Sequence, residues 1–91
     1  MELNEVIFID NLPTIDLHGY DSQYADLKIK EFISDNIIMQ NEIIAIVHGL
    51  GTGIIKNQTH QTLKKHKQVL DYKLFYNNVG ITIAKLKINK I

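Results

Sequence analysis

One segment, Ile43–Val47, constrains the fold of this chain more than any other. Its residues are all apolar and mostly β-branched, and no polar residue interrupts them. This pattern is typical of a strand that is buried on both faces, as in a parallel sheet covered by other elements. The run ends in a glycine-rich segment, His48–Gly53, so we expect a buried strand followed by a tight loop.

A shorter strand is predicted earlier in the chain, over Thr14–His18, and it ends at Gly19. Successive side chains of a strand point to opposite faces of the sheet. Asp16 and His18 should therefore be neighbours on one face, near the carboxyl end of this strand.

The remaining segments alternate between helical and strand patterns. Residues 1–13 are expected to form an extra edge strand or an extended lead-in, and residues 14–91 the folded domain. Two helices and two closing strands are predicted over Ser22–Ile38, Ile54–Gln68, Tyr72–Tyr76 and Gly80–Ile88. The fold class is then α/β: a two-layer βαβαββ sandwich whose mixed four-stranded sheet carries two helices on one face. The last strand should be antiparallel to the strand before it.

Length and composition exclude several classes of protein. A chain of 91 residues forms one domain. The absence of cysteine excludes a disulfide framework, a thiolate metal site and a cysteine nucleophile. No apolar stretch is long enough to span a membrane and no secretory signal opens the chain, so the expected location is the cytoplasm.

The net charge of zero conceals an uneven distribution of charge. Nine of the ten acidic residues precede residue 47, eight of the ten lysines follow it, and arginine is absent. Lys56, Lys64 and Lys67 form a stripe on the second predicted helix, together with His60, which is expected to be an ordinary surface residue. The stripe is either a solvated helix face or a patch that follows a nucleic-acid backbone.

The two glycine-bearing turns are predicted to lie at the same edge of the sheet, where open α/β sheets bind their ligands. If their strands are adjacent, Asp16, His18 and His48 should converge in one cleft. The amides of the second loop and the N-terminus of the following helix suit a phosphate-sized anion. The residues expected to bind that anion are Gly49, Gly51, Thr52, Gly53, Lys56 and Lys64.

The glycine loop does not match the common nucleotide-binding motifs. A P-loop has Gly-Lys followed by Ser or Thr, whereas Gly53 is followed by Ile54. The dinucleotide fingerprint is G-x-G-x-x-G, whereas this loop is G-x-G-x-G, and Asp71 precedes the next predicted strand instead of ending it. These departures argue against a nucleotide-binding domain.

Two motifs resemble signatures of the small MutS-related (Smr) domain family. Asp16–Gly19 resembles the family's L-D-L-H-G strand end, and His48–Gly53 resembles its H-G-x-G-T-G loop. Gly80–Leu86 is similar to the family's closing G-x-T-x-V-x-L strand. The resemblance covers Thr14 to Lys87 in the same order. The chain departs from it at Leu50, where the family usually has Lys or Arg.

The resemblance implies a βαβαββ-type fold, nucleic acid as partner, and in several members an endonuclease that nicks DNA or cleaves RNA. Such activities belong to DNA repair or, at stalled or collided ribosomes, to ribosome quality control. It also implies that the chain is either free-standing or the C-terminal domain of a larger bacterial MutS-like protein.

The predicted function is therefore phosphodiester cleavage, with Asp16, His18 and His48 as the catalytic residues. One imidazole would take a proton from the attacking oxygen and another would protonate the leaving oxygen, while Asp16 would orient His18 or act as the base. These three side chains could also bind a divalent metal such as magnesium. The alternative is a nucleic-acid- or ribosome-binding module without catalysis, which Leu50 and the neutral net charge favour.

Overall fold

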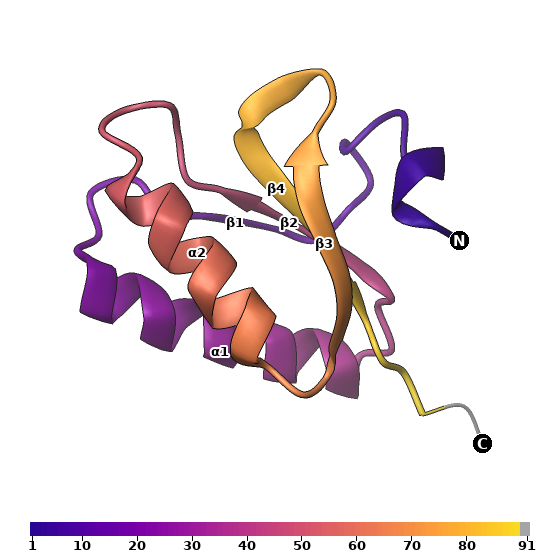
Figure 1. Ribbon diagram of the computed structural model, residues 1–91. Coiled ribbons are helices and arrows are strands. Elements are labelled where there is room, and N and C mark those ends of the chain that lie inside the picture. Colours follow the sequence, from indigo (N-terminus) through magenta and orange to yellow (C-terminus); the bar gives the residue numbers. More distant parts are fainter. Residues whose placement is uncertain (90–91) are drawn as a thin grey trace.

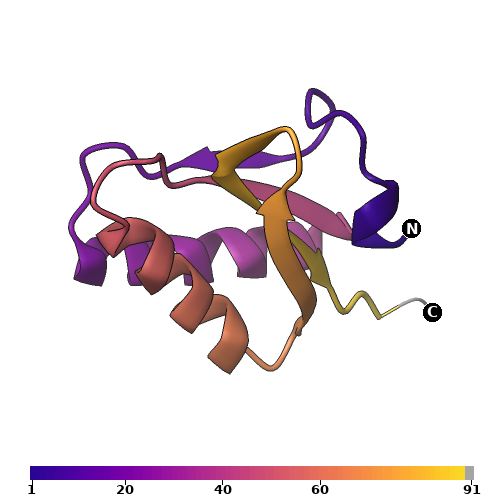
Figure 2. The ribbon, with the colours of Figure 1, turned by 45° about the horizontal axis from the view of Figure 1, so that its top comes forward.

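The computed structural model describes residues 1–89 as a twisted sheet with two helices packed on one face (Figure 1; Figure 2). The α/β sandwich predicted from the sequence is thus confirmed. In chain order the elements are the 3₁₀ helix η1 (Leu3–Glu5), β1 (Thr14–Asp16), α1 (Ser22–Ile38), β2 (Ile43–Val47), α2 (Ile54–Lys65), β3 (Val69–Phe75) and β4 (Asn78–Leu86).

The four strands lie in the order β1-β2-β4-β3, which makes the sheet mixed. β1 and β2 are parallel, and β4 is antiparallel to both β2 and β3. The predicted antiparallel closing pair is confirmed. A strand–helix–strand unit usually gives parallel neighbours, and this is true here of β1 and β2 but not of β2 and β3. A short turn brings β4 back along β3 on the side that faces β2, and β4 separates those two strands.

The bounds of α1 and β2 agree with the prediction, and the later elements are shifted. Asp21 caps the N-terminus of α1, because its Oδ1 accepts a hydrogen bond of 2.8 Å from the Tyr24 amide. α2 ends at Lys65 instead of Gln68, because His66 already has an extended backbone. None of the helices within residues 1–89 is long and apolar enough to cross a membrane.

The sheet separates two apolar clusters. The larger lies under α1 and α2 and contains Ile44 and Ile46 of β2, and the smaller lies on the other face and contains Ile43 and Ala45. β2 thus buries alternate side chains on both faces, which confirms the interpretation of its unbroken apolar run.

The N-terminal segment covers the second face of the sheet and adds no strand to the four that the described residues form. Leu3 and Val6 are buried there against Phe75 and Ile83. An ion pair of 2.6 Å between Glu2 and Lys85 ties the segment to β4. The edge-strand alternative for residues 1–13 is therefore wrong within the described chain, because Leu3 and Val6 are buried against a sheet face instead of pairing with its edge.

Candidate functional site

The two glycine-bearing turns lie at the same end of the sheet, as predicted. Both views of the ribbon show the loop after β1 beside the loop after β2 (Figure 1; Figure 2). The two strands are adjacent, and Asp16 pairs in register with Val47. Gly19, Gly49 and Gly53 have φ angles of 82°, 81° and 86°, a left-handed backbone that favours glycine.

The first turn exposes a carboxylate and an imidazole. Asp16 Oδ1 accepts a hydrogen bond of 2.9 Å from the backbone N–H of His18, so Asp16 fixes the His18 backbone. Both residues are exposed, and within residues 1–89 the His18 ring has no hydrogen-bond partner. Both side chains can therefore reach a ligand from solvent.

The second turn holds its imidazole differently, because His48 is engaged at both ring nitrogens. Its Nδ1 lies 3.0 Å from the carbonyl oxygen of Gly49, and its Nε2 lies 2.7 Å from Oγ1 of Thr82. Burial lowers the pKa of His48 below its usual value, and the nearby Lys56 charge adds to this, against the raising effect of the Gly49 carbonyl. The ring is therefore neutral at pH 7.

Asp16 and His18 do not converge with His48. Asp16 is in register with Val47, and neighbours in register point to the same face of a sheet. His48, the next residue, instead turns toward Thr82, which is buried on the side that α2 covers. No hydrogen bond or ion pair links either residue to His48 in the described chain, and residues 1–89 contain no group of three His, Asp or Glu side chains that could hold a metal ion. The described residues therefore do not form the three-ligand metal site that the sequence left possible.

His60 is a half-buried member of the site, so the prediction that it is an ordinary surface residue was wrong. Its Nε2 lies 2.8 Å from Thr82 Oγ1, opposite His48. The two imidazole rings meet edge to face, with centroids 5.9 Å apart. Burial lowers the pKa of His60, and the proximity of His48 and Lys56 lowers it further.

The glycine loop is anchored to β4 by its backbone. The amides of His48 and Gly49 both donate to the carbonyl oxygen of Gly80, at 3.0 and 2.9 Å. The two chains approach closely there, since a Cβ on Gly80 would lie 3.4 Å from the Gly49 Cα and 3.1 Å from Asn78 Oδ1. Glycine at position 80 thus permits the contact that fixes the start of the loop.

The rest of the loop is open to a ligand. A Cβ built on Gly49, Gly51 or Gly53 would meet no atom within 4 Å. In the described chain the backbone N–H groups of Gly51, Thr52 and Gly53 donate to no protein acceptor. Together with the first amides of α2 they form a set of donors at a helix N-terminus, which is suited to a phosphate group.

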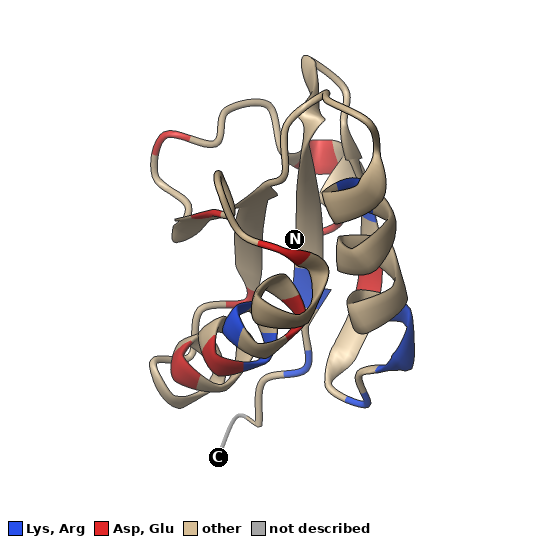
Figure 3. Ribbon diagram, turned by 90° about the vertical axis from the view of Figure 1, so that its left-hand side faces the viewer, with Lys and Arg blue, Asp and Glu red and all other residues tan. Residues whose placement is uncertain are grey.

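The basic residues of α2 divide between two places. Lys56 lies near the paired imidazoles, since its charge affects the pKa of both. Lys64 is exposed, and Figure 3 shows basic residues gathered at the C-terminal end of α2 and in the turn that follows. The sequence prediction included Lys64 and Lys67 but missed Lys65.

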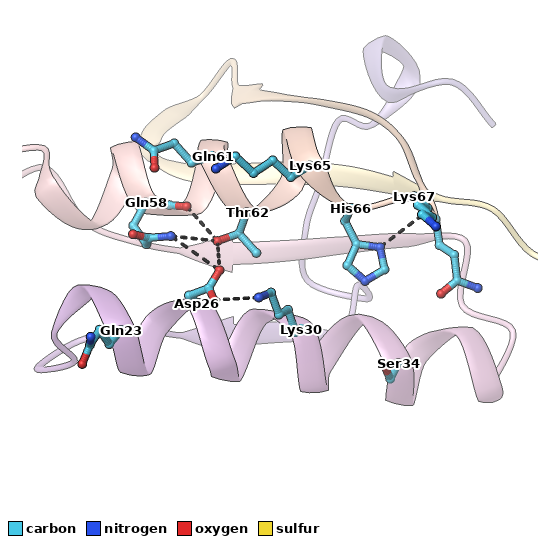
Figure 4. A pocket seen from close by; sticks show the side chains of 11 residues that line it. Gln23, Asp26, Lys30, Ser34, Gln58, Gln61, Thr62, Lys65, His66 and Lys67 are labelled. Atoms are coloured by element: carbon cyan, nitrogen blue, oxygen red, sulfur yellow. Dashed lines mark hydrogen bonds and ion pairs between the residues drawn. The ribbon is translucent and has the colours of Figure 1, made fainter.

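A groove of about 720 Å³ runs between α1 and α2 (Figure 4). Gln23 and Gln58 lie toward the end of the groove at which both helices begin, and His66 and Lys67 lie at the other. Its lining residues are polar, and they include three lysines and one acidic residue: Gln23, Asp26, Lys30, Ser34, Gln58, Gln61, Thr62, Lys65, His66, Lys67 and Gln68. The groove thus leads from the edge that carries the glycine turns to the basic end of α2.

One acidic side chain, Asp26, lies in this groove and is already engaged. Its carboxylate forms an ion pair of 2.8 Å with Lys30 and accepts a hydrogen bond of 2.6 Å from Thr62. These contacts lower the pKa of Asp26, that with Lys30 most strongly. Asp26 therefore joins α1 to α2 and leaves Lys65 and Lys67 as the cations that face an incoming anion.

Sequence reasoning missed Thr82 as a site residue and assigned no role to His60. The signal for Thr82 was the Gly-x-Thr pattern of the closing strand, since a hydroxyl among apolar strand residues needs a partner. His60 follows Lys56 by one helical turn, which places it on the same side of α2, beside the loop. Neither signal shows that β4 occupies the centre of the sheet, and that position brings the two residues together.

Comparisons with known proteins agree with these motifs. Residues 15–87 match the family model described as the Smr domain. Two proteins named Endonuclease MutS2, from Brevibacillus brevis and Staphylococcus aureus, are each 33% identical to this chain over 76 residues, or 80% of its length. The match covers only 10% and 11% of those two proteins, so this chain spans about a tenth of their length.

Solved structures show the same fold. The Smr domain of Thermus thermophilus MutS2 superimposes with a TM-score of 0.80 at 20% identity, over 82% of this chain and 98% of that domain. YdaL, a stand-alone small MutS-related protein from Escherichia coli, superimposes with a TM-score of 0.77 at 16% identity, over 81% of this chain and 63% of that one.

Proposed function

This chain belongs to the Smr family, and from that premise we propose that it is an endonuclease that cleaves RNA or nicks DNA in the cytoplasm. The observation that carries the proposal is the pairing of two different turns at one sheet edge. One exposes Asp16 and His18, and the other offers the free backbone amides of Gly51–Gly53. Cleavage of a phosphodiester needs both kinds of group, because donors must stabilise the negative charge on the phosphate while an acid and a base transfer protons.

The glycine loop supplies the electrostatic part of the proposed reaction. Phosphoryl transfer places negative charge on the oxygens that do not leave, and donors fixed in advance stabilise that charge. The free amides of Gly51, Thr52 and Gly53 and the N-terminal end of α2 are such donors. Lys56 adds a positive charge close by.

The first turn supplies the proton transfers. We assign Asp16 and His18 as the acid–base pair: one removes the proton from the attacking hydroxyl or water, and the other protonates the leaving oxygen. His48 receives no proton-transfer role, because both of its nitrogens are hydrogen-bonded within the protein. No step is assigned to a metal ion, because the three predicted ligands lie apart.

The groove between the helices extends the proposed contact with nucleic acid. Lys65 and Lys67 would contact phosphates as point charges. Glutamine side chains such as Gln58 and Gln61 offer amide groups along the same path. A strand held at the glycine edge could thus continue along the groove toward the basic end of α2.

The proposal is tested by incubating the chain with end-labelled single-stranded RNA and with duplex DNA, each with magnesium or with EDTA. We expect cleavage of one substrate by the wild type and none by an Asp16→Ala/His18→Ala variant. Asp35→Ala, which removes an exposed carboxylate from α1, is the matched control and should cleave normally. The EDTA reactions show whether a divalent ion takes part.

A second candidate function rests on Leu50. This side chain is 72% exposed on the glycine loop, where it can neither pair with phosphate nor donate a hydrogen bond. An apolar tip favours a module that binds nucleic acid or the ribosome without cutting. If neither substrate is cleaved while a salt-sensitive gel shift remains, the binding module replaces the endonuclease. Leu50→Lys should then strengthen binding severalfold.

A further inference from the structure

A continuous chain of hydrogen bonds runs from α2 through β4 to the glycine loop. His60 Nε2 lies 2.8 Å from Thr82 Oγ1, which lies 2.7 Å from His48 Nε2. His48 Nδ1 then lies 3.0 Å from the carbonyl oxygen of Gly49. Thr82 is fully buried, so water cannot replace either partner of its hydroxyl.

With both rings neutral, the chemistry of these groups allows one arrangement of protons. The Gly49 carbonyl can only accept, so His48 carries its proton on Nδ1 and its Nε2 is a lone pair. The Thr82 hydroxyl must donate its single proton to that lone pair. The Thr82 oxygen therefore accepts from His60, which carries its proton on Nε2.

We infer that Thr82 and His60 are positioning residues, which act through His48 to hold the glycine loop in the conformation that leaves its backbone amides free for an anion. The consequence for phosphate rests on the function proposed above, whereas the hydrogen-bond chain does not. None of the three side chains needs to touch the substrate.

The geometry of a peptide group explains how a side chain behind the loop controls donors in front of it. In a trans peptide the C=O and the following N–H point in opposite directions. His48 holds the Gly49 carbonyl toward its own ring, so the N–H of Leu50 must point away from that ring. The same contact orients the start of the segment that carries the free amides of Gly51–Gly53.

The surroundings of His48 and His60 favour the neutral form of both imidazoles. The His60 ring packs against Tyr72, with centroids 5.3 Å apart, and Lys56 supplies the nearest positive charge to both imidazoles. A second proton on His48 would make Nε2 a donor, and Thr82 would then face two donors with no acceptor for its own hydrogen. The open loop therefore requires both rings to be neutral.

The first test reads the tautomers directly. Long-range ¹H–¹⁵N correlation spectra of histidine-labelled protein at pH 7.5 should show His48 as the Nδ1–H tautomer and His60 as the Nε2–H tautomer. Thr82→Val keeps the size of the side chain and removes the hydroxyl that holds the His48 ring against the Gly49 carbonyl, so His48 should lose its single tautomer, whereas Thr82→Ser should retain it. An Nε2–H tautomer of His48 in the wild type would overturn the inference, whether or not the protein cleaves anything.

The second test asks whether α2 controls the loop. His60→Phe removes the donor to Thr82, and His60→Gln can restore it through its side-chain NH₂. We expect His60→Phe to weaken binding of single-stranded RNA about tenfold, the effect of one lost hydrogen bond in a buried chain, and His60→Gln to recover most of it. Equal binding by the two variants would contradict a positioning role. If the wild type shows the expected tautomers but cleaves neither RNA nor DNA, the result would instead count against the proposed catalytic pair.

Discussion

The two His-Gly turns of this protein look alike in sequence and differ in what their imidazoles do. Each follows a strand, and the glycine φ angles agree to one degree, 82° at Gly19 and 81° at Gly49. His18 nevertheless stands exposed at the end of an edge strand, whereas His48 lies at the end of a central strand and is bonded on both ring nitrogens. The position of a strand in the sheet thus separates an exposed histidine from one that is held by hydrogen bonds.

The largest expected difference between the two turns appears when each imidazole is removed in turn and cleavage is measured. His18→Ala should lower the cleavage rate by about 10²- to 10⁴-fold, the usual contribution of a general acid or base, with little change in RNA binding. His48→Ala should weaken binding as well as cleavage, because the loop loses its support. If His18→Ala cleaves normally, the assignment of the reactive turn is wrong.

The same two substitutions should differ in the opposite order when stability is measured. His48→Ala leaves the buried Thr82 hydroxyl without an acceptor, which costs about 1–3 kcal/mol of unfolding free energy. His18→Ala removes an exposed ring that contacts no buried group, and such changes stay within about 0.5 kcal/mol. Urea denaturation of both variants measures the difference, and equal losses would contradict the division of roles.

The pH dependence of the unfolding free energy tests whether the fold holds His48 and His60 neutral. Burial holds the pKa of His48 and His60 below the usual value near 6.5, so the unfolded chain takes up their protons first as the pH falls. The unfolding free energy should be constant above about pH 7 and should fall as the pH drops below 6.5 and through the lowered folded pKa values. Urea midpoints at pH 7.5 and 5.5 measure this.

The matching variant is His48→Gln/His60→Gln, in which the fall between pH 7.5 and 5.5 should be smaller. Part of it should remain, because burial also lowers the pKa of His66. A fall as large as in the wild type would show that the two imidazoles are not held neutral by the fold.

The smallest expected effect concerns the groove that begins beside the two turns. Lys65→Ala and Lys67→Ala should each weaken nucleic-acid binding by a similar factor for every sequence, and each should reduce the slope of log affinity against log salt by about one. Lys28→Ala is the control, because Lys28 lies on α1 and pairs with Glu31. A salt slope unchanged in both groove variants would exclude the groove as a path for the backbone.

Local patterns predicted the parts of the fold that local forces determine. The amphipathic spacing after Asp21 gave the bounds of α1, and the apolar run gave those of β2. Both turns were placed at the right edge, because parallel strands end on the same side. The segment before Pro13 was harder to predict, since Leu3 and Val6 fit a strand as well as an apolar cover on the sheet.

What could not be predicted depends on contacts between distant segments. The alternation of side chains along a strand determines which face Asp16 and His48 point to. The sequence does not show at which residue each strand ends and this alternation stops. The partnership of His60 and Thr82 joins positions 22 residues apart and exists only because β4 lies between β2 and β3. Helical spacing alone therefore placed His60 on the surface.

The central place of β4 also determines when the sheet of this protein can be completed during synthesis. The strand synthesised last joins both halves of the sheet, so β2 and β3 cannot belong to one sheet until residues 78–86 have emerged from the ribosome. The glycine loop, synthesised some thirty residues earlier, finds its anchor at Gly80 only then. A nascent chain that is still growing therefore carries the sequence of the glycine loop without its folded shape, and the two turns reach their final arrangement only after residues 78–86 have been added.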